Sequence, residues 1–347
     1  MGSERTRVPG RVATMKDVAA LAGVGLTTVS RVINGTPVDP VLTDKVLEAA
    51  QQLGYRKDTT ATSLRRADRR TNTVGLVLED VANPFSSALH RAIEDASVER
   101  GLLVLASSND EKPERERELL KTLRTRRVDG LIVVSTGGAD EELDSAHRAG
   151  TPVVCVDRAS SLDTVDTVIA DNRGGVAKAV HVLHALGHRH IGFAGDRPAL
   201  WTARERYEGF AQAMAELGCP IRPAWICRDV HNAATTRRAV TQMLTAGGPA
   251  PTAIVTAQNS LTVGARLALV DLGLHDQVAH IGFDDFPLAD MLDPPVSVIA
   301  QDPAEMGRQA ARILFARIDE PDRPRELVTL PTRYIPRGSG EIRPPAR

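Results

Sequence analysis

From Thr73 onward the sequence alternates short apolar runs with helix-like segments, and this alternation constrains the fold more than any other feature. The apolar runs have the length and the Val and Ile content of buried strands, while the segments between them repeat apolar residues at helical spacing. Such alternation predicts parallel sheets covered by helices on both faces, and the length of this region predicts two lobes. Because open α/β sheets bind ligands at the carboxyl ends of their strands, we expect a binding site in a cleft between the lobes.

The expected strands fall into two series. TVGLVLED, LLVLASS, DGLIVVST and TPVVCVD form the first, with helical patterns near residues 85–100, 113–127 and 140–149 between them. The second series is TVIAD, HIGFAG, AWICRDV, TAIVTAQ and HIGFDD. It is followed by VSVIAQ, a helix over residues 303–318 and a closing run, LVTLPTRYI. We assign this two-lobed region to residues 73–340 and expect a short tail at residues 341–347.

The first 57 residues show helical periodicity and no convincing strand. Thr14 and Asp17 have the spacing of a capping box at the start of a helix. Asp39 before Pro40 predicts the start of a later helix, which Gly54 ends. We therefore expect a flexible basic tail at residues 1–13, a three-helix unit at residues 14–57 and a linker at residues 58–72.

The stretch DVAALAGVGLTTVSRVIN places a Gly-Val-Gly turn between two apolar-periodic runs. A phosphate-binding loop needs a strand before the turn, whereas DVAALA has helical spacing, and no Gly-Lys-Ser/Thr follows. A helix-turn-helix accounts for the positions better, because Gly23 can adopt the positive φ of a tight turn and Val24 can fill the junction. An ordinary helical hairpin is the remaining alternative. The second helix of a helix-turn-helix contacts DNA near its start, which here exposes Leu26, Thr27, Ser30 and Arg31.

Charge is distributed unevenly along the chain. Residues 1–72 hold 12 Lys and Arg against 7 Asp and Glu, a net charge of +5, and the rest holds 31 against 37, a net charge of −6. A basic N-terminal region on an acidic body agrees with a nucleic-acid-binding module joined to a second function, although charged runs also occur as solvated faces.

The length of 347 residues, with 42% hydrophobic content, predicts two or three domains. The apolar runs are too short to span a membrane, and MGSERTRVPGR lacks the apolar stretch of a signal peptide, so we expect a cytoplasmic protein. Cys155, Cys219 and Cys227 lack CxxC spacing, which favours buried thiols over disulfides or a zinc site.

Several motifs in register resemble the LacI/GalR (lactose-repressor) family of bacterial transcription regulators. The likeness begins with KDVAALAGVGLTTVSRVIN, VLEAAQQLGYRKD and SLRR before TNTVGLVLEDVANPF. It continues in family order with PERERELLKTLRTRRVDGLIV, VCVDR, ALGHRHIGFAG, ARERYEGF and IGFDD. The resemblance covers nearly the whole chain. It implies an N-terminal all-α helix-turn-helix DNA-binding domain joined to an α/β periplasmic-binding-protein-like core of two parallel-sheet lobes. It also implies a dimer that binds a roughly palindromic double-stranded operator and senses a small molecule.

The same resemblance implies DNA-binding roles for individual residues. Family positions that contact operator bases match Leu26, Thr27 and Arg31, and positions that help to hold the DNA backbone match Thr28, Ser30 and Asn34.

The linker resembles the hinge helix of the family, whose leucine enters the minor groove at the operator centre and kinks it. That leucine is Leu64, preceded by Ala61. Packing of Leu64 on the body is the alternative. Because Thr59, Thr60 and Thr62 weaken helix propensity, we expect the hinge to be ordered only on DNA.

For the effector, positions that touch ligands in relatives match Phe85, Ser86, Asp157, Thr202, Arg206, Asp284 and Gln301. The two aspartates are suited to accept hydrogen bonds from sugar hydroxyls, and the arginine is suited to bind a ring oxygen, a hydroxyl or an anionic group. Each residue also fits a structural salt bridge or a helix cap, but together they favour a polar ligand.

Two further effector positions depart from the family pattern. Gln258 and Asn259 stand where Asn-Asp is usual, and Val230 stands where some relatives place an aromatic residue. The loss of a carboxylate and of a stacking ring favours a sugar or a sugar-like polyol over a purine.

Other polar clusters have structural interpretations. A metal site at His181, His184, His188 and His190 is the alternative to a helix end followed by a turn, because the family often has Gly-His-Arg there. The pair Asp284 and Asp285 resembles a general acid–base pair, but neighbours on a strand end point apart and no nucleophile accompanies them. We expect neither a metal nor a cofactor.

These observations predict a homodimeric DNA-binding transcription regulator and most simply a repressor, with a tetramer as the alternative assembly, located in the cytoplasm and at the nucleoid when bound to DNA. An effector closing the cleft would shift the N-terminal lobes of the two subunits and change operator affinity. The alternatives are an α/β enzyme acting on sugars or nucleotides with an appended helical domain, which no Walker loop, GxSxG or metal cluster supports, and a pure binding protein, which the missing signal peptide disfavours.

Overall fold

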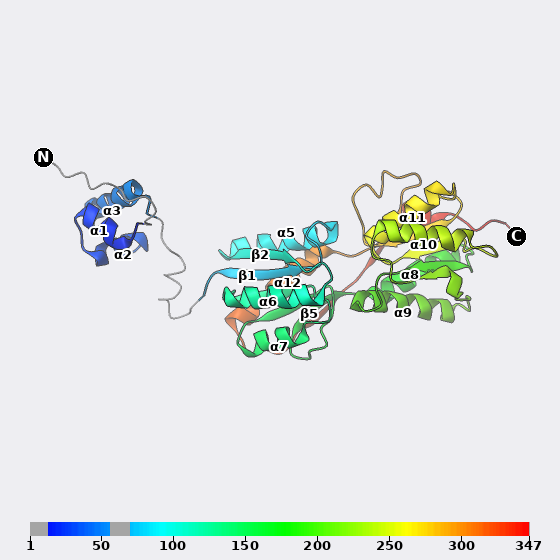
Figure 1. Cartoon of the computed structure of the whole chain (residues 1–347), viewed down its shortest axis with the longest axis horizontal. Coiled ribbons are helices and arrows are strands. Elements are labelled where there is room, and N and C mark those ends of the chain that lie inside the picture. Colours follow the sequence, from blue (N-terminus) through cyan, green and yellow to red (C-terminus); the bar gives the residue numbers. More distant parts are fainter. Residues whose placement is uncertain (1–12, 56–69, 347) are drawn as a thin grey trace. The chain divides into compact units, whose positions relative to one another are not determined.

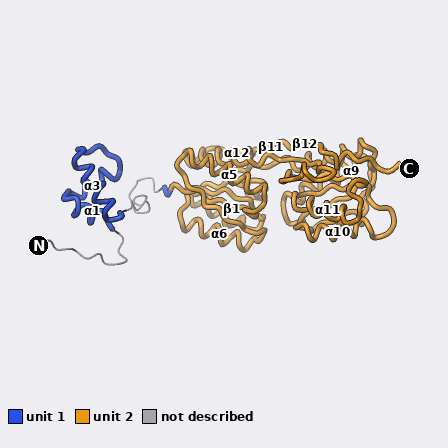
Figure 2. The backbone as a smooth tube through the Cα atoms, turned by 90° about the horizontal axis from the view of Figure 1, so that it is seen from above, with its two compact units in different colours: residues 1–71 blue, residues 72–347 orange. Residues whose placement is uncertain are grey.

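The computed structural model describes residues 13–55 and 70–346, and the chain divides into two units, Met1–Thr71 and Asn72–Arg347 (Figures 1 and 2). The predicted hinge residues Ala61 and Leu64 lie outside the described residues. Among the described helices, none is both long and apolar enough to cross a membrane.

The described residues of the smaller unit form three helices, α1 (Met15–Ala22), α2 (Leu26–Ile33) and α3 (Pro40–Leu53). The Thr14 side chain accepts from the backbone N–H of Asp17, and the Asp17 side chain accepts in return from the backbone of Thr14, so the predicted capping box is present. The Asp39 side chain caps α3, which begins at Pro40 and ends before a left-handed Gly54. The residues that start and stop these helices were therefore recognisable in the sequence.

A small apolar core joins the three helices. Val18, Val29 and Val46 have no exposed surface, and alanines of α3 and half-buried apolar residues surround them. Gly23 has φ 65°, in the left-handed region, and this lets the chain turn directly from α1 into α2. Half-buried Val24 packs against the same core.

The first lobe of the larger unit contains one six-stranded sheet. Its elements are β1 (Thr73–Leu78), α5 (Pro84–Glu99), β2 (Leu103–Ser108), α6 (Pro113–Thr125), β3 (Gly130–Val133), α7 (Asp140–Arg148), β4 (Val153–Val156), β5 (Asp166–Ala170), α12 (Pro303–Asp319) and β11 (Leu327–Leu330). The strand order is β11-β5-β4-β3-β1-β2, and all pairs are parallel. Apolar residues of α5 and α12 cover one face and those of α6 and α7 the other.

The second lobe repeats this plan. Its elements are α8 (Asn172–Ala185), β6 (Ile191–Ala194), α9 (Trp201–Glu216), η1 (Pro223–Trp225), β7 (Ile226–Cys227), α10 (Ala233–Thr245), β8 (Ala253–Thr256), α11 (Asn259–Asp271), β9 (Ala279–Phe283), β10 (Ser297–Ala300), β12 (Arg333–Ile335) and η2 (Ser339–Glu341). The strand order is β12-β10-β9-β8-β6-β7. Helices α8 and α9 cover one face, and α10 and α11 cover the other.

The chain passes between the lobes three times, after β5, after β10 and after β11 (Figure 2). The predicted closing run, LVTLPTRYI, is two strands, one in each lobe. Strand β11 is parallel to β5 and ends at the cleft, so the chain enters the second lobe from its carboxyl edge and β12 pairs antiparallel with β10. Both sheets are therefore dominated by parallel pairs, as predicted, and β12 is an antiparallel edge strand.

Two residues of the segment that we assigned to a tail contact the second lobe. Glu341 accepts hydrogen bonds from Ser297 and Tyr334, and the carbonyl of Ile342 contacts Nε2 of His188 at 2.8 Å.

Candidate functional site

Helix α2 of the smaller unit exposes apolar and basic side chains on one face. Leu26 is 45% exposed, and Thr27 and Arg31 are exposed as well, whereas Val29 is fully buried beneath them. Leu26 begins the helix and Arg31 lies in its last turn, so together they are suited to contact both the apolar and the polar groups of base edges.

The start of α2 lacks a side-chain cap, because its N-cap residue is Gly25. Helix N-termini favour anions, so this end of α2 is suited to a phosphate group. Thr28 and Ser30 are half-buried beside the exposed face. Asn34 follows the helix, and its side-chain amide donates to the Ser30 carbonyl at 2.7 Å.

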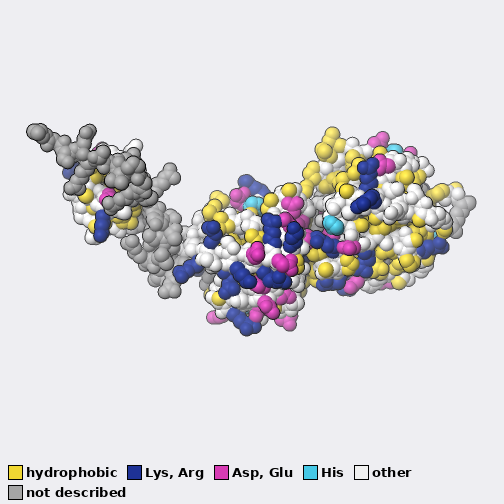
Figure 3. Space-filling view, in the orientation of Figure 1, with side chains coloured by type: hydrophobic (Ala, Val, Ile, Leu, Met, Phe, Trp, Pro, Cys, Tyr) yellow, Lys and Arg dark blue, Asp and Glu magenta, His cyan; other side chains and the backbone are white. Residues whose placement is uncertain are grey.

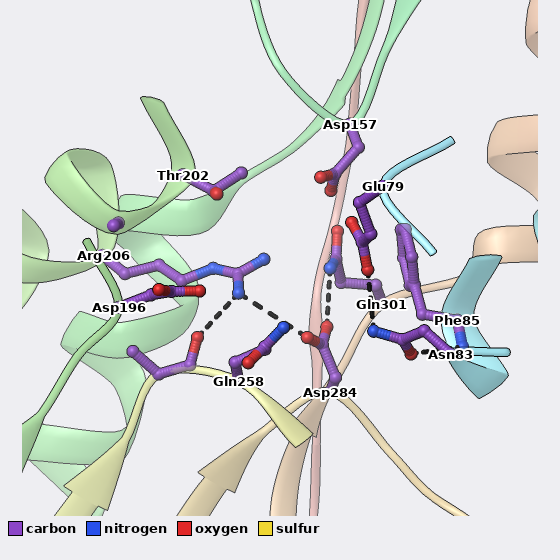
Figure 4. A pocket seen from close by; sticks show the side chains of 12 residues that line it. Glu79, Asn83, Phe85, Asp157, Asp196, Thr202, Arg206, Gln258, Asp284 and Gln301 are labelled. Atoms are coloured by element: carbon purple, nitrogen blue, oxygen red, sulfur yellow. Dashed lines mark hydrogen bonds and ion pairs between the residues drawn. The ribbon is translucent and has the colours of Figure 1, made fainter. Parts of the chain in front are cut away.

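A polar pocket lies in the larger unit where the carboxyl ends of the two sheets meet (Figure 4). Its empty volume, which includes open solvent, is about 380 Å³. The lining residues are Glu79, Asn83, Phe85, Asp157, Asp196, Thr202, Ala203, Arg206, Ala257, Gln258, Asp284 and Gln301. Side chains of both acidic and basic residues also lie on the surface over the junction of the lobes (Figure 3).

The structure brings seven of the nine predicted effector residues to this pocket: Phe85, Asp157, Thr202, Arg206, Gln258, Asp284 and Gln301. Ser86 is not among the lining residues; it is fully buried, and its Oγ has no partner among the described residues. Val230 does not line the pocket either, because it packs into the second-lobe core with Ala194 and Trp225.

Sequence reasoning missed Glu79, Asn83, Asp196, Ala203 and Ala257. Three of these residues stand at positions that a sequence pattern could have marked. Glu79 directly follows β1, and Asp196 follows β6 after one glycine, so both lie at carboxyl strand ends. Asn83 before Pro84 has the pattern of a helix N-cap, and its side chain accepts from the backbone of Phe85 at 3.0 Å.

Asp157 and Asp284 occupy equivalent positions in the two lobes. Each follows a strand, β4 or β9, and each has φ 67°, in the left-handed region. Their backbone N–H groups donate to Val168 and Ile299 of the neighbouring strands at 2.9 Å. A non-glycine residue in this region costs about 1–2 kcal/mol, so the surrounding sheet holds both aspartates in a strained conformation at the pocket.

Arg206 is fixed from the second lobe. Its guanidinium donates to Asn172 and to the carbonyl of Ala257, each at 2.7 Å, and lies 4.0 Å from the centre of the Phe283 ring. Asp284 is 3.5 Å from the same guanidinium and accepts a hydrogen bond of 2.6 Å from the Gln301 amide. Arg206 is therefore held in place before any ligand binds.

The first-lobe side of the pocket contains a buried charge cluster. Arg158 donates two hydrogen bonds to Glu111, at 2.6 and 2.9 Å, and lies 3.5 Å from Glu79 and 3.6 Å from Asp157. Burial raises the pKa of Glu79 to about 8, although Arg158 acts in the opposite direction. Burial also raises the pKa of Asp157 to about 6. Burial therefore shifts both carboxyl groups toward the protonated form, and Glu79 more than Asp157.

A hydrogen bond connects the lobes across the pocket. The side-chain amide of Asn259, at the start of α11, donates to Oδ1 of Asn83 in the first lobe at 2.9 Å. Asn83 in turn donates to Glu79 at 2.7 Å. Polar contacts thus hold the two sides of the pocket together.

Three of the four histidines that suggested a metal site have separate surroundings. His181 contacts the carbonyl of Ala177, His188 lies between Thr252 and Ile342, and His190 packs on Trp225. Within residues 13–55 and 70–346, no group of three or more His, Cys, Asp or Glu side chains is arranged to hold a metal ion. Cys155 and Cys219 are buried and Cys227 is half-buried, and all three are free thiols.

Comparison with known proteins matches both units. Residues 14–58 match the profile of bacterial regulatory proteins of the lacI family, and residues 71–337 match that of periplasmic binding proteins and the sugar binding domain of the LacI family. The chain is 32% identical over 317 residues to the HTH-type transcriptional repressor PurR of Haemophilus influenzae (strain PittEE), which covers 90% of this chain and 93% of the relative.

Solved structures show the same architecture. The complex of the transcriptional regulator CelR with cellobiose has 28% identity and a TM-score of 0.71, covering 94% of this chain and 99% of that one. The Lac repressor dimer bound to operator and the anti-inducer ONPF has 24% identity and a TM-score of 0.81, covering 95% and 99%.

A helix-turn-helix unit followed by a two-lobed α/β unit with a polar pocket defines a DNA-binding transcription regulator that has an effector-binding domain. This chain belongs to the LacI family. The resemblance, the fold class and the regulatory function predicted from the sequence are thereby confirmed.

Proposed function

We propose that this regulator represses transcription as a homodimer on a palindromic operator, and that a sugar or a sugar derivative bound between the lobes controls its operator affinity. The observation that carries the effector proposal is the pocket itself. Carboxyl and amide groups from the strand ends of both lobes converge there around a pre-positioned Arg206, with the ring of Phe85 on one side. Such a mixture of acceptors, donors and one apolar face suits the hydroxyls and the ring of a sugar.

For the DNA, we propose that Leu26, Thr27 and Arg31 choose the operator bases and that Thr28, Ser30 and Asn34 hold the backbone. The exposed face of α2 and the uncapped start of this helix support that division. Leu64, with Ala61 before it, remains our candidate for the minor-groove wedge.

Control of DNA binding follows from linkage. An effector that binds more tightly to one arrangement of the lobes shifts the protein toward it, and the operator must change effector affinity by the same factor. The Asn83–Asn259 hydrogen bond joins the two lobes, so an opening of the pocket would break it.

A homodimer is supported by exposed apolar side chains on one face of α11. Val263, Leu267 and Val270 are 36%, 43% and 50% exposed and lie at i, i+4 and i+7. A symmetric contact between two copies would bury this face. We propose a binding role and not a catalytic one, and a place in the cytoplasm, because the matched relatives are transcription regulators.

The DNA-reading part is tested by salt-titrated fluorescence anisotropy on palindromic sites from the regulator's own upstream region. Arg31→Ala should weaken specific binding by about 10- to 100-fold and relax the preference at one base position. Lys45→Ala, an exposed change on α3, serves as the matched control and should leave the base preference unchanged. Equal base preference in the Arg31 variant would rule out base reading by this residue.

The effector part is tested by a thermal-shift screen against sugars and nucleosides, followed by operator binding in the presence of each hit. Arg206→Ala should abolish the shift and the effect on operator binding. Arg204→Ala, an exposed change on the same helix outside the pocket lining, should preserve both. A hit whose binding survives Arg206→Ala would refute the pocket assignment.

A further inference from the structure

The pocket holds more carboxyl groups than its basic side chains neutralise. Glu79, Asp157, Asp196 and Asp284 line it, and Arg206 is the single basic residue among the described lining residues. A neutral polyol has no need for this excess of carboxylates, since hydroxyl recognition can use neutral side chains as well.

The cations around the pocket are already engaged, and Arg197 lies 3.7 Å from Asp196. Arg206 pairs with Asp284, and its other bonds go to Asn172 and a backbone carbonyl. Arg158 directs both of its terminal nitrogens to Glu111. Glu79 and Asp157 therefore share the guanidinium of Arg158, whose shortest contacts are to Glu111.

Two acceptor atoms at the pocket have no hydrogen-bond partner among the described residues. They are Oδ1 of Asp157, a residue that is only 4% exposed, and Oε1 of Gln301. The side chains of Asp157, Gln301 and Glu79 lie close together on one side of the pocket (Figure 4). Buried acceptors without donors are costly, so this group is suited to receive a ligand that brings donors.

We propose that the effector carries a primary amine, as an amino sugar does, and that Asp157, Gln301 and Glu79 bind its ammonium group. An ammonium group has three donors and a positive charge, which match three acceptors and the surplus of carboxylates. This inference rests on the proposed function, since it specifies the effector of that same pocket.

The remainder of an amino sugar fits the other side of the pocket. Arg206 and Thr202 from the second lobe supply donors for ring or hydroxyl oxygens, and Phe85 supplies an apolar surface for the C–H face of the ring. An amino sugar thus uses both the donor-rich and the acceptor-rich sides.

A cation bound at this position should also change the protonation of Glu79. Glu79 faces Arg158, Asp157, Glu111 and Asp284, and burial raises its pKa to about 8. An ammonium group beside Glu79 favours the ionised carboxylate and so lowers that pKa. Binding at neutral pH should therefore release up to about one proton, whereas binding of a neutral sugar should release almost none.

The test uses titration calorimetry of the full chain with D-glucosamine, D-galactosamine, D-mannosamine and kanosamine, each compared with its parent sugar and its N-acetyl form. At least one free amine should bind about tenfold or more tightly than both of its neutral counterparts. Repeating the titration in buffers of different ionisation enthalpy should reveal the released proton. Equal or tighter binding of the neutral sugars, or no binding of any amine, overturns the inference.

Substitutions in the pocket test which residues bind the ammonium group. Glu79→Gln and Asp157→Asn preserve shape and remove a charge, and each should reduce the preference for the amine by about tenfold while binding of the parent sugar changes little. Asp322→Asn, an exposed change in the loop after α12, is the matched control and should keep the full preference. An unchanged preference in both pocket variants would also overturn the inference.

Operator binding separates this inference from the proposed function. A neutral sugar that binds in the pocket and alters operator affinity would refute the amine and leave effector control standing. An amine that binds at this site without altering operator affinity would refute effector control and leave the amine site standing.

Discussion

Arg317 and Asp166 form an ion pair that lies almost entirely out of contact with water. Their side chains are 9% and 2% exposed, and two hydrogen bonds of 2.8 and 3.0 Å join them. Asp166 also accepts from the backbone of Glu326 at 2.7 Å, and Arg317 donates to the carbonyls of Pro321 and Pro324. The pair therefore connects α12 to β5 and to the loop that leads into β11.

Arg317→Leu should lower the unfolding free energy of the larger unit by about 3–5 kcal/mol, because it leaves a buried carboxylate without its partner. Urea denaturation followed by tryptophan fluorescence measures the loss. Arg91→Leu is the matched control, since Arg91 and Asp95 pair at 2.8 Å with side chains 71% and 56% exposed. The control should cost less than about 1 kcal/mol, and a similar loss in both variants would contradict the prediction.

His280 is a second buried ionisable group. It has no exposed surface, its Nε2 is 3.0 Å from Oγ1 of Thr256, and burial lowers its pKa to about 3. In the unfolded chain a histidine titrates near pH 6.5, so below that pH the unfolded state binds a proton that the folded state does not. Folding stability is therefore lost as the pH falls.

Between pH 7 and pH 5 this loss should amount to about 2 kcal/mol. Glu79 acts in the opposite direction, because its pKa is raised on folding, so the effect is measured as the difference between the wild type and His280→Leu. Urea denaturation at both pH values should show a smaller loss in the variant. An equal loss in both proteins would mean that His280 does not contribute.

At the scale of elements, the turn between α1 and α2 depends on its first glycine. Gly23 has φ 65°, whereas Gly25 has φ −69° and ψ 148°, an ordinary extended conformation. Neither position has any atom within 4 Å of an added Cβ, so only the backbone conformation distinguishes them.

Gly23→Ala should therefore lower the unfolding free energy of the smaller unit by about 1–2 kcal/mol, through left-handed strain alone. Gly25→Ala is the matched control and should change it by less than about 0.5 kcal/mol. Circular dichroism at the helix band, followed during heating, reports the helices of this unit. Equal effects of the two substitutions would contradict the explanation.

At the scale of the whole molecule, the two units have very different cores. Among the described residues, five buried side chains form the core of the smaller unit, whereas the larger unit has five separate clusters, four of which cover both faces of both sheets. Small cores give marginal stability. We therefore expect the full chain to unfold in two steps, the smaller unit first.

Differential scanning calorimetry of the full chain should show a small transition followed by a larger one. A fragment of residues 70–347 should keep the larger transition and its effector binding while losing operator binding. A single transition in the full chain, or an unfolded fragment, would show that the units depend on each other.

Assembly is a second property at this scale. Leu267→Glu places a charge in the exposed apolar face of α11 and should weaken the proposed dimer by about tenfold or more. Analytical ultracentrifugation over a range of concentrations measures the change. Lys178→Glu on α8 changes a charge elsewhere on the same lobe and should leave the dimer intact. A Leu267→Glu variant that dimerises like the wild type would exclude this face.

The local structure and the general architecture could be predicted from the order of residues along the chain. Helix caps such as Thr14 with Asp17 and Asp39 with Pro40, and the strand–helix alternation from Thr73, depend on neighbouring residues, so the pattern predicted them. Seven pocket residues were also predictable, because carboxyl strand ends in an α/β fold meet at one edge and a family resemblance marked the positions.

Features that depend on segments distant in the sequence became visible only in the folded molecule. Ser86 and Val230 lie inside cores because of the direction in which their elements pack, and the closing run became two strands because it crosses from one lobe to the other. The charge balance that marks Glu79 and Asp157 as a cation site likewise arises where β1, β4 and β9 end together. Burial and pairing are properties of the folded surroundings, so no local pattern contains them.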